Sequence, residues 1–256
     1  MDEQAKEIVL ILGSAPSAVE SQSWPKASFT SIVAINNAWR VRKDWDYLIV
    51  PDDFPTSHLP PAPEPEQRVI RSGDYVEANN AYGGVVYAGG TMAYSAGYWA
   101  LARLRPRILA FYGCDMIYPR QGPTHFYGAG TADPLRDDAT LRDLEAKSAR
   151  LMLHAARQGC ACVRLSDGPS RLVFPSVSRT DLTEVKPLGP GAGGALFADA
   201  CAMEEDLGYY VDCGRYWLEE HRLSKPAIDK LDHLWRRAAG LEMASARGDG
   251  PRHATA

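Results

Sequence analysis

The chain has 256 residues, which is enough for one large domain or for one domain with a small appendage. Its 45% hydrophobic and 23% charged residues are ordinary for a globular protein and argue against a disordered chain. The net charge of −4 provides no general basic field. It therefore argues against a constitutive nucleic-acid binder, although a local basic patch stays compatible with it.

The five cysteines are odd in number and lack C-x-x-C spacing, so the sequence favours reduced thiols over a disulfide framework or a zinc site. The first apolar run, residues 8–12, is too short for a signal-peptide core or a membrane span. We therefore expect a soluble, cytoplasmic protein that does not engage a membrane.

Short apolar runs predict buried strands, and longer runs with helical spacing predict helices. The expected strands are 8–12, 31–35, 46–50, 67–71, 82–87, 107–112 and 160–165, and the expected helices of this part are 92–104 and 137–158. Their alternation predicts an α/β fold, namely a Rossmann-like, mainly parallel sheet flanked by helices.

The last third of the chain predicts a small helical C-terminal extension. Residues 176–194 are rich in Pro, Gly and polar side chains, which is typical of a linker or mobile loop. The expected units are a catalytic domain at 1–175, this linker, a helical subdomain at 195–243 with helices at 195–206, 213–223 and 226–240, and a disordered tail at 244–256. The bulky aromatic residues of the helical subdomain are compatible with a lid or with a surface that binds a partner, and they permit a homo-oligomer.

Small and polar residues follow the first two strands and precede the helix at 92–104. Residues 13–17, Gly-Ser-Ala-Pro-Ser, predict a tight turn through which the backbone can approach a ligand, although a plain strand-to-helix turn explains them equally well. Asn36 and Asn37 follow the second strand and offer both donors and acceptors to a nucleobase, although asparagine is also a common turn former. Gly90 and Thr91 start the helix, where amides and the helix dipole favour an anion, although a Gly pair is also ordinary turn chemistry.

The strand at 107–112 is followed by the most polar stretch of the candidate site. Asp115, Tyr118, His125 and Tyr127 lie on the chain that leaves this strand. In open α/β sheets ligands bind beyond the carboxyl ends of strands, so these side chains are candidate site residues; the alternative is an ordinary loop. The adjacent Asp52–Asp53 pair does not predict a metal site, because neighbouring residues of an extended segment point to opposite sides.

These pieces together resemble a known superfamily. The order strand-GSAPS, strand-NN, GGT before a helix, strand-GCDMIY and THFYG is similar to that of bacterial sialyltransferases and the motility-associated glycosyltransferases that modify flagellin. Archaeal 6-hydroxymethylpterin diphosphokinases look like a sister branch. The resemblance covers residues 7–165, whereas the whole chain is similar to uncharacterised proteins of phages and prophages.

The resemblance implies specific roles. It implies nucleotide binding by Gly13, Ser14, Pro16, Ser17, Asn36 or Asn37, Gly90 and Thr91, phosphate binding by Tyr118 and Tyr127, and a catalytic base at His125. By its residue type, Asp115 either orients His125 or binds a sugar hydroxyl, or it only caps the loop after the strand. Histidine suits the base because its ordinary pKa is about 6.5.

The resemblance therefore implies a metal-independent glycosyltransferase without a resident cofactor, using a nucleotide-sugar donor such as a cytidine monophosphate sugar. The acceptor is a glycan or lipid hydroxyl, or a hydroxymethylated base in a DNA-modification pathway of a phage. One alternative is ATP-dependent diphosphate transfer to a pterin-like alcohol, which requires Mg²⁺. Another is a non-catalytic nucleotide-binding protein of a phage.

Overall fold

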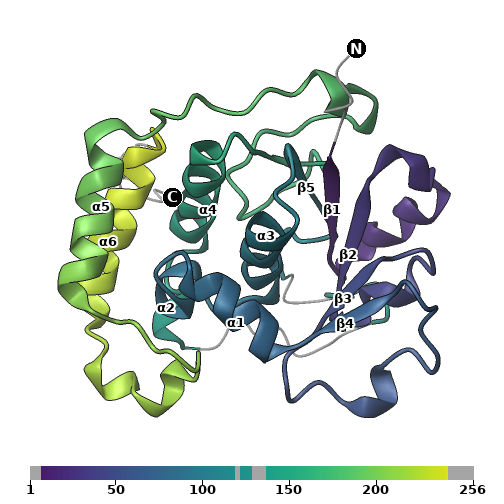
Figure 1. Cartoon of the computed structure of the whole chain (residues 1–256), viewed down its shortest axis with the longest axis horizontal. Coiled ribbons are helices and arrows are strands. Elements are labelled where there is room, and N and C mark those ends of the chain that lie inside the picture. Colours follow the sequence, from purple (N-terminus) through teal and green to yellow (C-terminus); the bar gives the residue numbers. More distant parts are fainter. Residues whose placement is uncertain (1–6, 119–121, 129–136, 242–256) are drawn as a thin grey trace, which may run out of the picture.

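Six parallel strands form one sheet in the order β4-β3-β2-β1-β5-β6 (Figure 1). The computed structural model describes residues 7–118, 122–128 and 137–241. The strands are β1 (Ile8–Leu12), β2 (Ser31–Ile35), β3 (Tyr47–Ile49), β4 (Arg68–Ile70), β5 (Ile108–Tyr112) and β6 (Ala161–Arg164). Each lies within one of the predicted apolar runs, so the predicted α/β fold with its Rossmann-like parallel sheet is confirmed.

Both faces of the sheet are buried, and alternate residues of each strand face different cores. In β1, Val9 and Ile11 face the core beneath α3 (Met92–Arg103), whereas Leu10 and Leu12 face the opposite core. The α-helices gather on the first side of the sheet, with α4 (Leu144–Arg157) next to α3. The second side is covered by 3-10 helices and loops (Figure 1). Burial on both faces explains why the strands read as continuous apolar runs.

Short 3-10 helices make up much of the remaining described structure. They span Pro16–Ser23, Lys26–Ser28, Asn36–Arg40, Thr56–His58, Ala139–Leu141, Arg179–Glu184, Tyr216–Leu218 and Glu220–Arg222.

The predicted strand at 82–87 is wrong, because this part of the chain is helical. Helix α1 (Ser72–Asn80) precedes it, and α2 (Val85–Ala88) follows two glycines, Gly83 and Gly84, that both have positive φ. All four residues of α2 are buried. Its apolar run lacks the alternation that distinguishes a half-buried strand, and a short apolar run alone does not separate strand from helix.

The predicted helix at 137–158 begins later than expected. Asp143 caps α4 by accepting a hydrogen bond from the Ala146 amide, so the helix starts at Leu144. Residues before it form a separate 3-10 helix. A side-chain oxygen that accepts a hydrogen bond from the amide of the third helical residue is typical of the N-cap, the residue at which a helix begins.

The C-terminal helices α5 (Gly194–Leu207) and α6 (Lys225–Ala238) confirm two of the three predicted helices and lie on the far side of α4 from the sheet (Figure 1). The helix predicted at 213–223 is wrong, since two 3-10 helices occupy this segment and Gly214, with φ +70°, breaks the helical path before them. The predicted disordered tail lies outside the described residues. No helix among residues 7–118 and 137–241 has the length and apolar character to cross a bilayer.

The predicted linker at 176–194 packs against the sheet. Ser176 forms a parallel backbone bridge with Arg164, the last residue of β6. Leu182 is buried in the core on the second side of the sheet. Arg107 donates a hydrogen bond to the Val185 carbonyl at 2.9 Å. This segment therefore runs across the sheet before it reaches α5.

Buried ion pairs join the C-terminal helices to α4. Lys147 pairs with Asp232 at 2.8 Å and Arg150 with Glu204 at 2.6 Å, and all four side chains are largely withdrawn from water. Trp235 also donates to Glu204 at 2.8 Å. A buried charge without its partner is costly, so these pairs fix how α5 and α6 dock on α4.

Strands β2, β3 and β4 lie on one side of β1, and β5 and β6 lie on the other. Two glycines are in contact where β1 and β5 end. The Gly13 amide donates to the Tyr112 carbonyl at 2.8 Å, and the Ala15 amide donates to the Gly113 carbonyl at 3.0 Å. A Cβ at position 13 would lie 2.2 Å from the Gly113 oxygen and 2.7 Å from Cys114 Sγ. Only glycine fits at position 13 without moving the backbone.

We expect Gly13→Ala to destabilise the protein by about 3 kcal/mol or more, because the clash involves backbone atoms that cannot swing aside. Gly73→Ala in α1 is the matched control, since nothing lies within 4 Å of the added methyl group. It should be neutral or stabilising by less than about 1 kcal/mol. Urea unfolding measures both changes, and equal stabilities of the two variants would contradict the close approach.

Candidate active site

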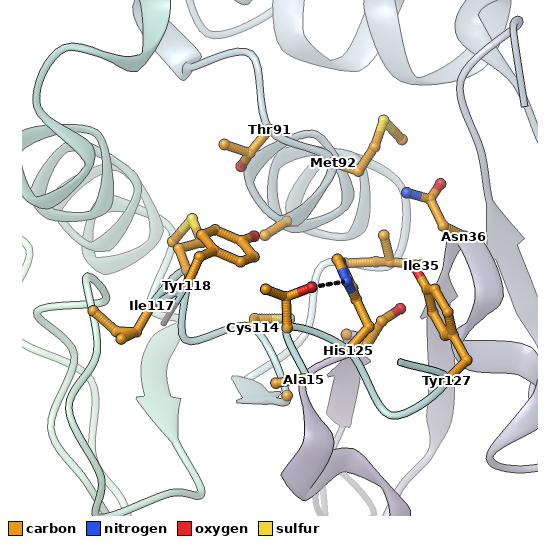
Figure 2. A pocket seen from close by; sticks show the side chains of 16 residues that line it. Ala15, Ile35, Asn36, Thr91, Met92, Cys114, Ile117, Tyr118, His125 and Tyr127 are labelled. Carbon is orange, nitrogen blue, oxygen red and sulfur yellow. Dashed lines mark hydrogen bonds between the residues drawn. The ribbon is translucent and has the colours of Figure 1, made fainter. Parts of the chain in front are cut away.

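A pocket lies at the carboxyl edge of the sheet, where β1, β2 and β5 end and α3 begins (Figure 2). Its empty space, which includes the open solvent at its mouth, is about 820 Å³. The reversal of strand order beside β1 creates this crevice, as it does in other open parallel sheets. The lining residues are Gly13, Ser14, Ala15, Ile35, Asn36, Thr91, Met92, Ala93, Gly113, Cys114, Met116, Ile117, Tyr118, Thr124, His125 and Tyr127.

The turn after β1 supplies the part of the wall that has the smallest side chains. Gly13 and Ser14 line the pocket, as does Ala15. Pro16 and Ser17, which the sequence also implicated, are exposed and do not line it, because they begin a 3-10 helix that turns away. The backbone at positions 13–15 therefore borders the pocket, with the Gly13 and Ala15 amides already bonded within the protein.

Asn36 follows β2 in a left-handed conformation, with φ +51°. Asparagine tolerates this region better than most residues. Its Oδ1 is buried, and it accepts no hydrogen bond from any residue in the described part of the chain. Asn37 is buried in the following 3-10 helix and does not line the pocket. Of the two candidate asparagines, the structure brings Asn36 to the pocket.

The first turn of α3 faces the pocket. Thr91 caps the helix, its Oγ1 accepting from the Tyr94 amide at 3.3 Å, and Met92 and Ala93 line the pocket beside it (Figure 2). Gly90 does not line the pocket, and its amide instead donates to Thr140 Oγ1 at 3.1 Å. The positive end of a 12-residue helix therefore borders the space, which favours a bound anion.

His125 lies between two tyrosines in the pocket (Figure 2). Its Nδ1 is hydrogen-bonded to Thr124 Oγ1 at 2.9 Å, and its ring stacks on that of Tyr127 with centroids 4.9 Å apart and planes 17° apart. The Phe126 amide donates to the Ser14 carbonyl at 3.0 Å, which ties this loop to the turn after β1. Burial lowers the pKa of His125 below its usual value, so the neutral imidazole predominates at neutral pH.

The two candidate phosphate-binding tyrosines occupy opposite sides of this histidine. The Tyr118 ring centroid lies 6.1 Å from that of His125, and its side chain extends toward the space below the start of α3 (Figure 2). Tyr127 is 43% exposed and lies nearer to Asn36 in the same view. The two hydroxyl-bearing rings therefore frame the imidazole within one pocket.

Asp115 has a different position from the one that the sequence implied. Its Oδ1 accepts a hydrogen bond from Ser166 Oγ at 2.9 Å, and the residue does not line the pocket. Burial raises the pKa of this carboxyl group, opposed by the Ser166 hydrogen bond and by Arg164. Asp115 thus joins the chain leaving β5 to the loop after β6.

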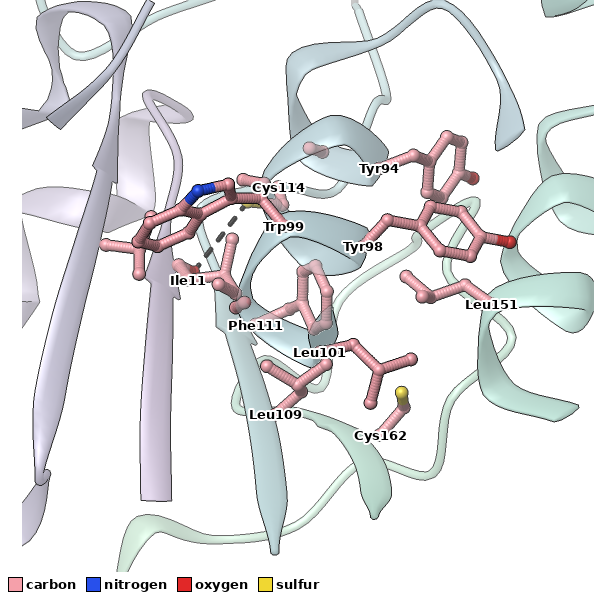
Figure 3. Close-up of a cluster of buried hydrophobic side chains, with 14 of the residues drawn as sticks. Ile11, Tyr94, Tyr98, Trp99, Leu101, Leu109, Phe111, Cys114, Leu151 and Cys162 are labelled. Atoms are coloured by element: carbon pink, nitrogen blue, oxygen red, sulfur yellow. Dashed lines mark hydrogen bonds between the residues drawn. The ribbon is translucent and has the colours of Figure 1, made fainter. Parts of the chain in front are cut away.

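The floor of the pocket rests on the core between the sheet and α3. Cys114 lines the pocket, and Figure 3 shows its sulfur above Ile11, in the cluster that also contains Phe111 and Trp99. Its Sγ donates a long hydrogen bond to the Ile11 carbonyl at 3.8 Å. Burial raises the pKa of this thiol, so it remains protonated and acts as an apolar wall.

Several lining residues were not singled out from the sequence. Thr124 is the most informative of them, because it holds one nitrogen of His125, and its position next to that histidine in the chain was the available signal. Met116 and Ile117 lie in the GCDMIY stretch but had no role assigned to them, and Met92 is apolar like its neighbours in α3. In the described ranges no group of three or more His, Cys, Asp or Glu side chains is placed to hold a metal ion.

The fold and the pocket define a Rossmann-like α/β protein with a candidate ligand site at its topological switch point. No protein-family model, curated protein sequence or solved structure matches this chain significantly.

Removing the ring that covers His125 should raise the pKa of the imidazole. We expect Tyr127→Ala to move it toward the ordinary value of about 6.5, because burial is what lowers it. In the wild type, the stability linked to this group is present above pH 6.5 and is lost as the pH falls through the lower folded-state pKa. NMR titration of the imidazole measures the shift.

Tyr210→Ala is the control for this titration. Tyr210 is 46% exposed and its hydroxyl donates to Asp212, so its loss should leave the pKa of His125 unchanged. A wild-type His125 that titrates at or above 6.5 would contradict the burial argument.

Proposed function

We propose that this protein is a glycosyltransferase that moves a sugar from a nucleotide-sugar donor to an acceptor hydroxyl. The observation that carries the proposal is the presence of a neutral, oriented histidine in the same pocket as the start of α3. The first is suited to remove a proton and the second to bind a phosphate. The resemblance of the sequence motifs to nucleotide-sugar transferases supports the same reaction.

His125 is the proposed general base. In the tautomer that carries the ring proton on Nδ1, this N–H donates a hydrogen bond to Thr124 Oγ1, and the lone pair of Nε2 can accept a proton. The acceptor oxygen loses its proton to Nε2 and forms the new bond to the anomeric carbon. The bond between that carbon and the phosphate oxygen breaks, and the phosphate retains the electron pair. A pKa lowered by burial keeps the imidazole competent as a base in mildly acidic solution.

The departing phosphate is proposed to lie at the start of α3, with the Tyr118 hydroxyl as an additional donor. The first turn of α3, at residues 91–93, supplies helix-terminal amides, and the turn after β1 brings the backbone of Ser14 to the same pocket. Donors placed where negative charge develops stabilise the leaving group.

Asn36 is proposed to bind the base of the nucleotide. Its side-chain amide lines the pocket and offers both a donor and an acceptor, so it can pair with the edge of a base, for example with N4 of cytosine. Uracil has a carbonyl oxygen at the same place. Adenine also carries an exocyclic amino group, so it is the motif resemblance that favours a cytidine nucleotide as the donor carrier.

A thermal-shift screen tests the donor. We expect cytidine monophosphate to raise the melting temperature more than the uridine, adenine or guanine monophosphate at the same concentration, because ligand stabilisation follows affinity. Asn36→Gly retains access to φ +51° but removes the amide, so it should weaken cytidine monophosphate binding about tenfold. Binding of inorganic pyrophosphate should be unchanged in this variant. Equal stabilisation by cytidine and uridine nucleotides would refute the base assignment.

Replacement of the base tests the reaction. We expect His125→Ala to lower kcat about 10²- to 10⁴-fold while the affinity for the nucleotide changes little, because general-base catalysis contributes this much to rate. His58→Ala is the control, since His58 is exposed in a 3-10 helix and does not line the pocket. Transfer of radiolabelled sugar measures both variants, and full activity of His125→Ala would exclude His125 as the base.

A further inference from the structure

A hydrogen-bonded network connects the C-terminal part of the chain to the start of α3. Tyr216 donates to Asp138 Oδ2 at 2.6 Å, and Thr140 donates to Asp138 Oδ1 at 2.7 Å through its hydroxyl and again through its amide. The Thr140 hydroxyl also accepts from the Gly90 amide at 3.1 Å. Gly90 immediately precedes Thr91, which caps α3 and lines the pocket.

The turn before α3 is also held by close packing. A Cβ at Gly90 would lie 2.5 Å from Thr140 Oγ1 and 2.9 Å from the Tyr216 hydroxyl. Gly89 has φ +95°, and its Cβ would lie 3.0 Å from the Lys147 side chain of α4. The two glycines therefore fit against α4 and the C-terminal part with no spare room, which fixes the direction in which α3 begins.

We propose that Tyr216, Asp138 and Thr140 are positioning residues that hold the start of α3 in its anion-binding orientation. Through them the C-terminal part of the chain sets the affinity of the pocket for the donor phosphate. This inference rests on the proposed function for the role of the helix start, but the connection itself is independent of any ligand. It also gives the C-terminal part, which lies outside the motif resemblance, a task in the reaction.

The chemistry of the network favours a stiff connection. Tyr216 and Thr140 are almost fully buried, and the Asp138 carboxylate accepts hydrogen bonds from both. Hydrogen bonds to an ionised group in a site sheltered from water are stronger than neutral ones, and each member of the network orients the next. Loss of the Tyr216 hydroxyl removes its hydrogen bond to Asp138, while Thr140 remains bonded to the same carboxylate.

Tyr216→Phe tests the proposal because it removes only the hydroxyl. With cytidine monophosphate as the calorimetric probe, the dissociation constant should rise about three- to tenfold, as expected for an indirect coupling. In a transfer assay the KM for the donor should rise. The midpoint of the acid limb in the pH profile of kcat, which reports His125, should stay unchanged. Tyr210→Phe is the matched control, since its hydroxyl donates to Asp212 in the same part of the chain and touches neither Gly90 nor Asp138.

A conservative pair at position 140 separates positioning from general stability. Thr140→Ser retains the hydroxyl and should retain wild-type affinity, whereas Thr140→Val should match Tyr216→Phe. Should Tyr216→Phe fail to fold, Asp138→Asn takes its place, because it retains the shape of the side chain. A lowered melting temperature with unchanged donor KM in these variants would reduce the network to a structural role and overturn the proposal.

Hydrogen exchange of the amides at 90–94 provides a readout that needs no ligand. Exchange should accelerate in Tyr216→Phe and Thr140→Val but not in Thr140→Ser or Tyr210→Phe. If the wild-type protein binds no nucleotide and the variants still show this pattern of exchange, the proposed function fails and the connection stands. If nucleotides bind normally and exchange at 90–94 is the same in all variants, the connection fails and the proposed function stands.

Discussion

The contact between Gly13 and Gly113 is the constraint on which the pocket depends. Parallel strands β1 and β5 lie side by side, and the chain leaves each of them at the same edge of the sheet. Because neither glycine carries a side chain, the two turns can cross with the Gly13 amide still bonded to β5 and the Ala15 amide bonded to Gly113. Any larger residue would force the turns apart. The same crossing brings the backbone of the first turn and the floor residue Cys114 to one place, so the geometry that closes the fold also opens the pocket.

Two opposite electrostatic requirements meet in this pocket. An anion site needs positive potential, which the start of α3 supplies through fixed backbone dipoles instead of a charged side chain. A general base needs to stay uncharged, which burial of His125 achieves. A lysine or arginine would meet the first requirement but would also depress the basicity of a nearby imidazole. Partial charges from the helix favour the phosphate with a smaller effect on the histidine, so the two functions can occupy adjacent positions.

Much of the fold was readable from the sequence because the sheet is buried on both faces. Continuous apolar runs such as 8–12 and 108–112 have few alternatives to a central parallel strand, and small or polar residues at their ends predicted where a site would form. The run at 82–87 was misread because α2 is buried on all sides and has no period to reveal it. The sequence interpretation linked Asp115 to His125, whereas the carboxyl group bonds to Ser166 in the loop after β6. This contact spans 51 residues, so no local pattern around Asp115 could reveal it.

The polar contacts of the C-terminal part show why its role could not be read from local patterns. Of its aromatic residues, Tyr210 and Trp217 are exposed, whereas Tyr216 and Trp235 are buried and use their polar atoms internally. The Tyr216–Asp138 bond spans 78 residues, and neither residue lies in a motif. Buried charge pairs hold α5 and α6 against α4, which would be an expensive arrangement if only apolar cover were needed, since desolvation opposes each pair. Directional bonds fix one docking position where apolar packing tolerates several, and a fixed position is what the start of α3 requires if it is to present its amides to a phosphate.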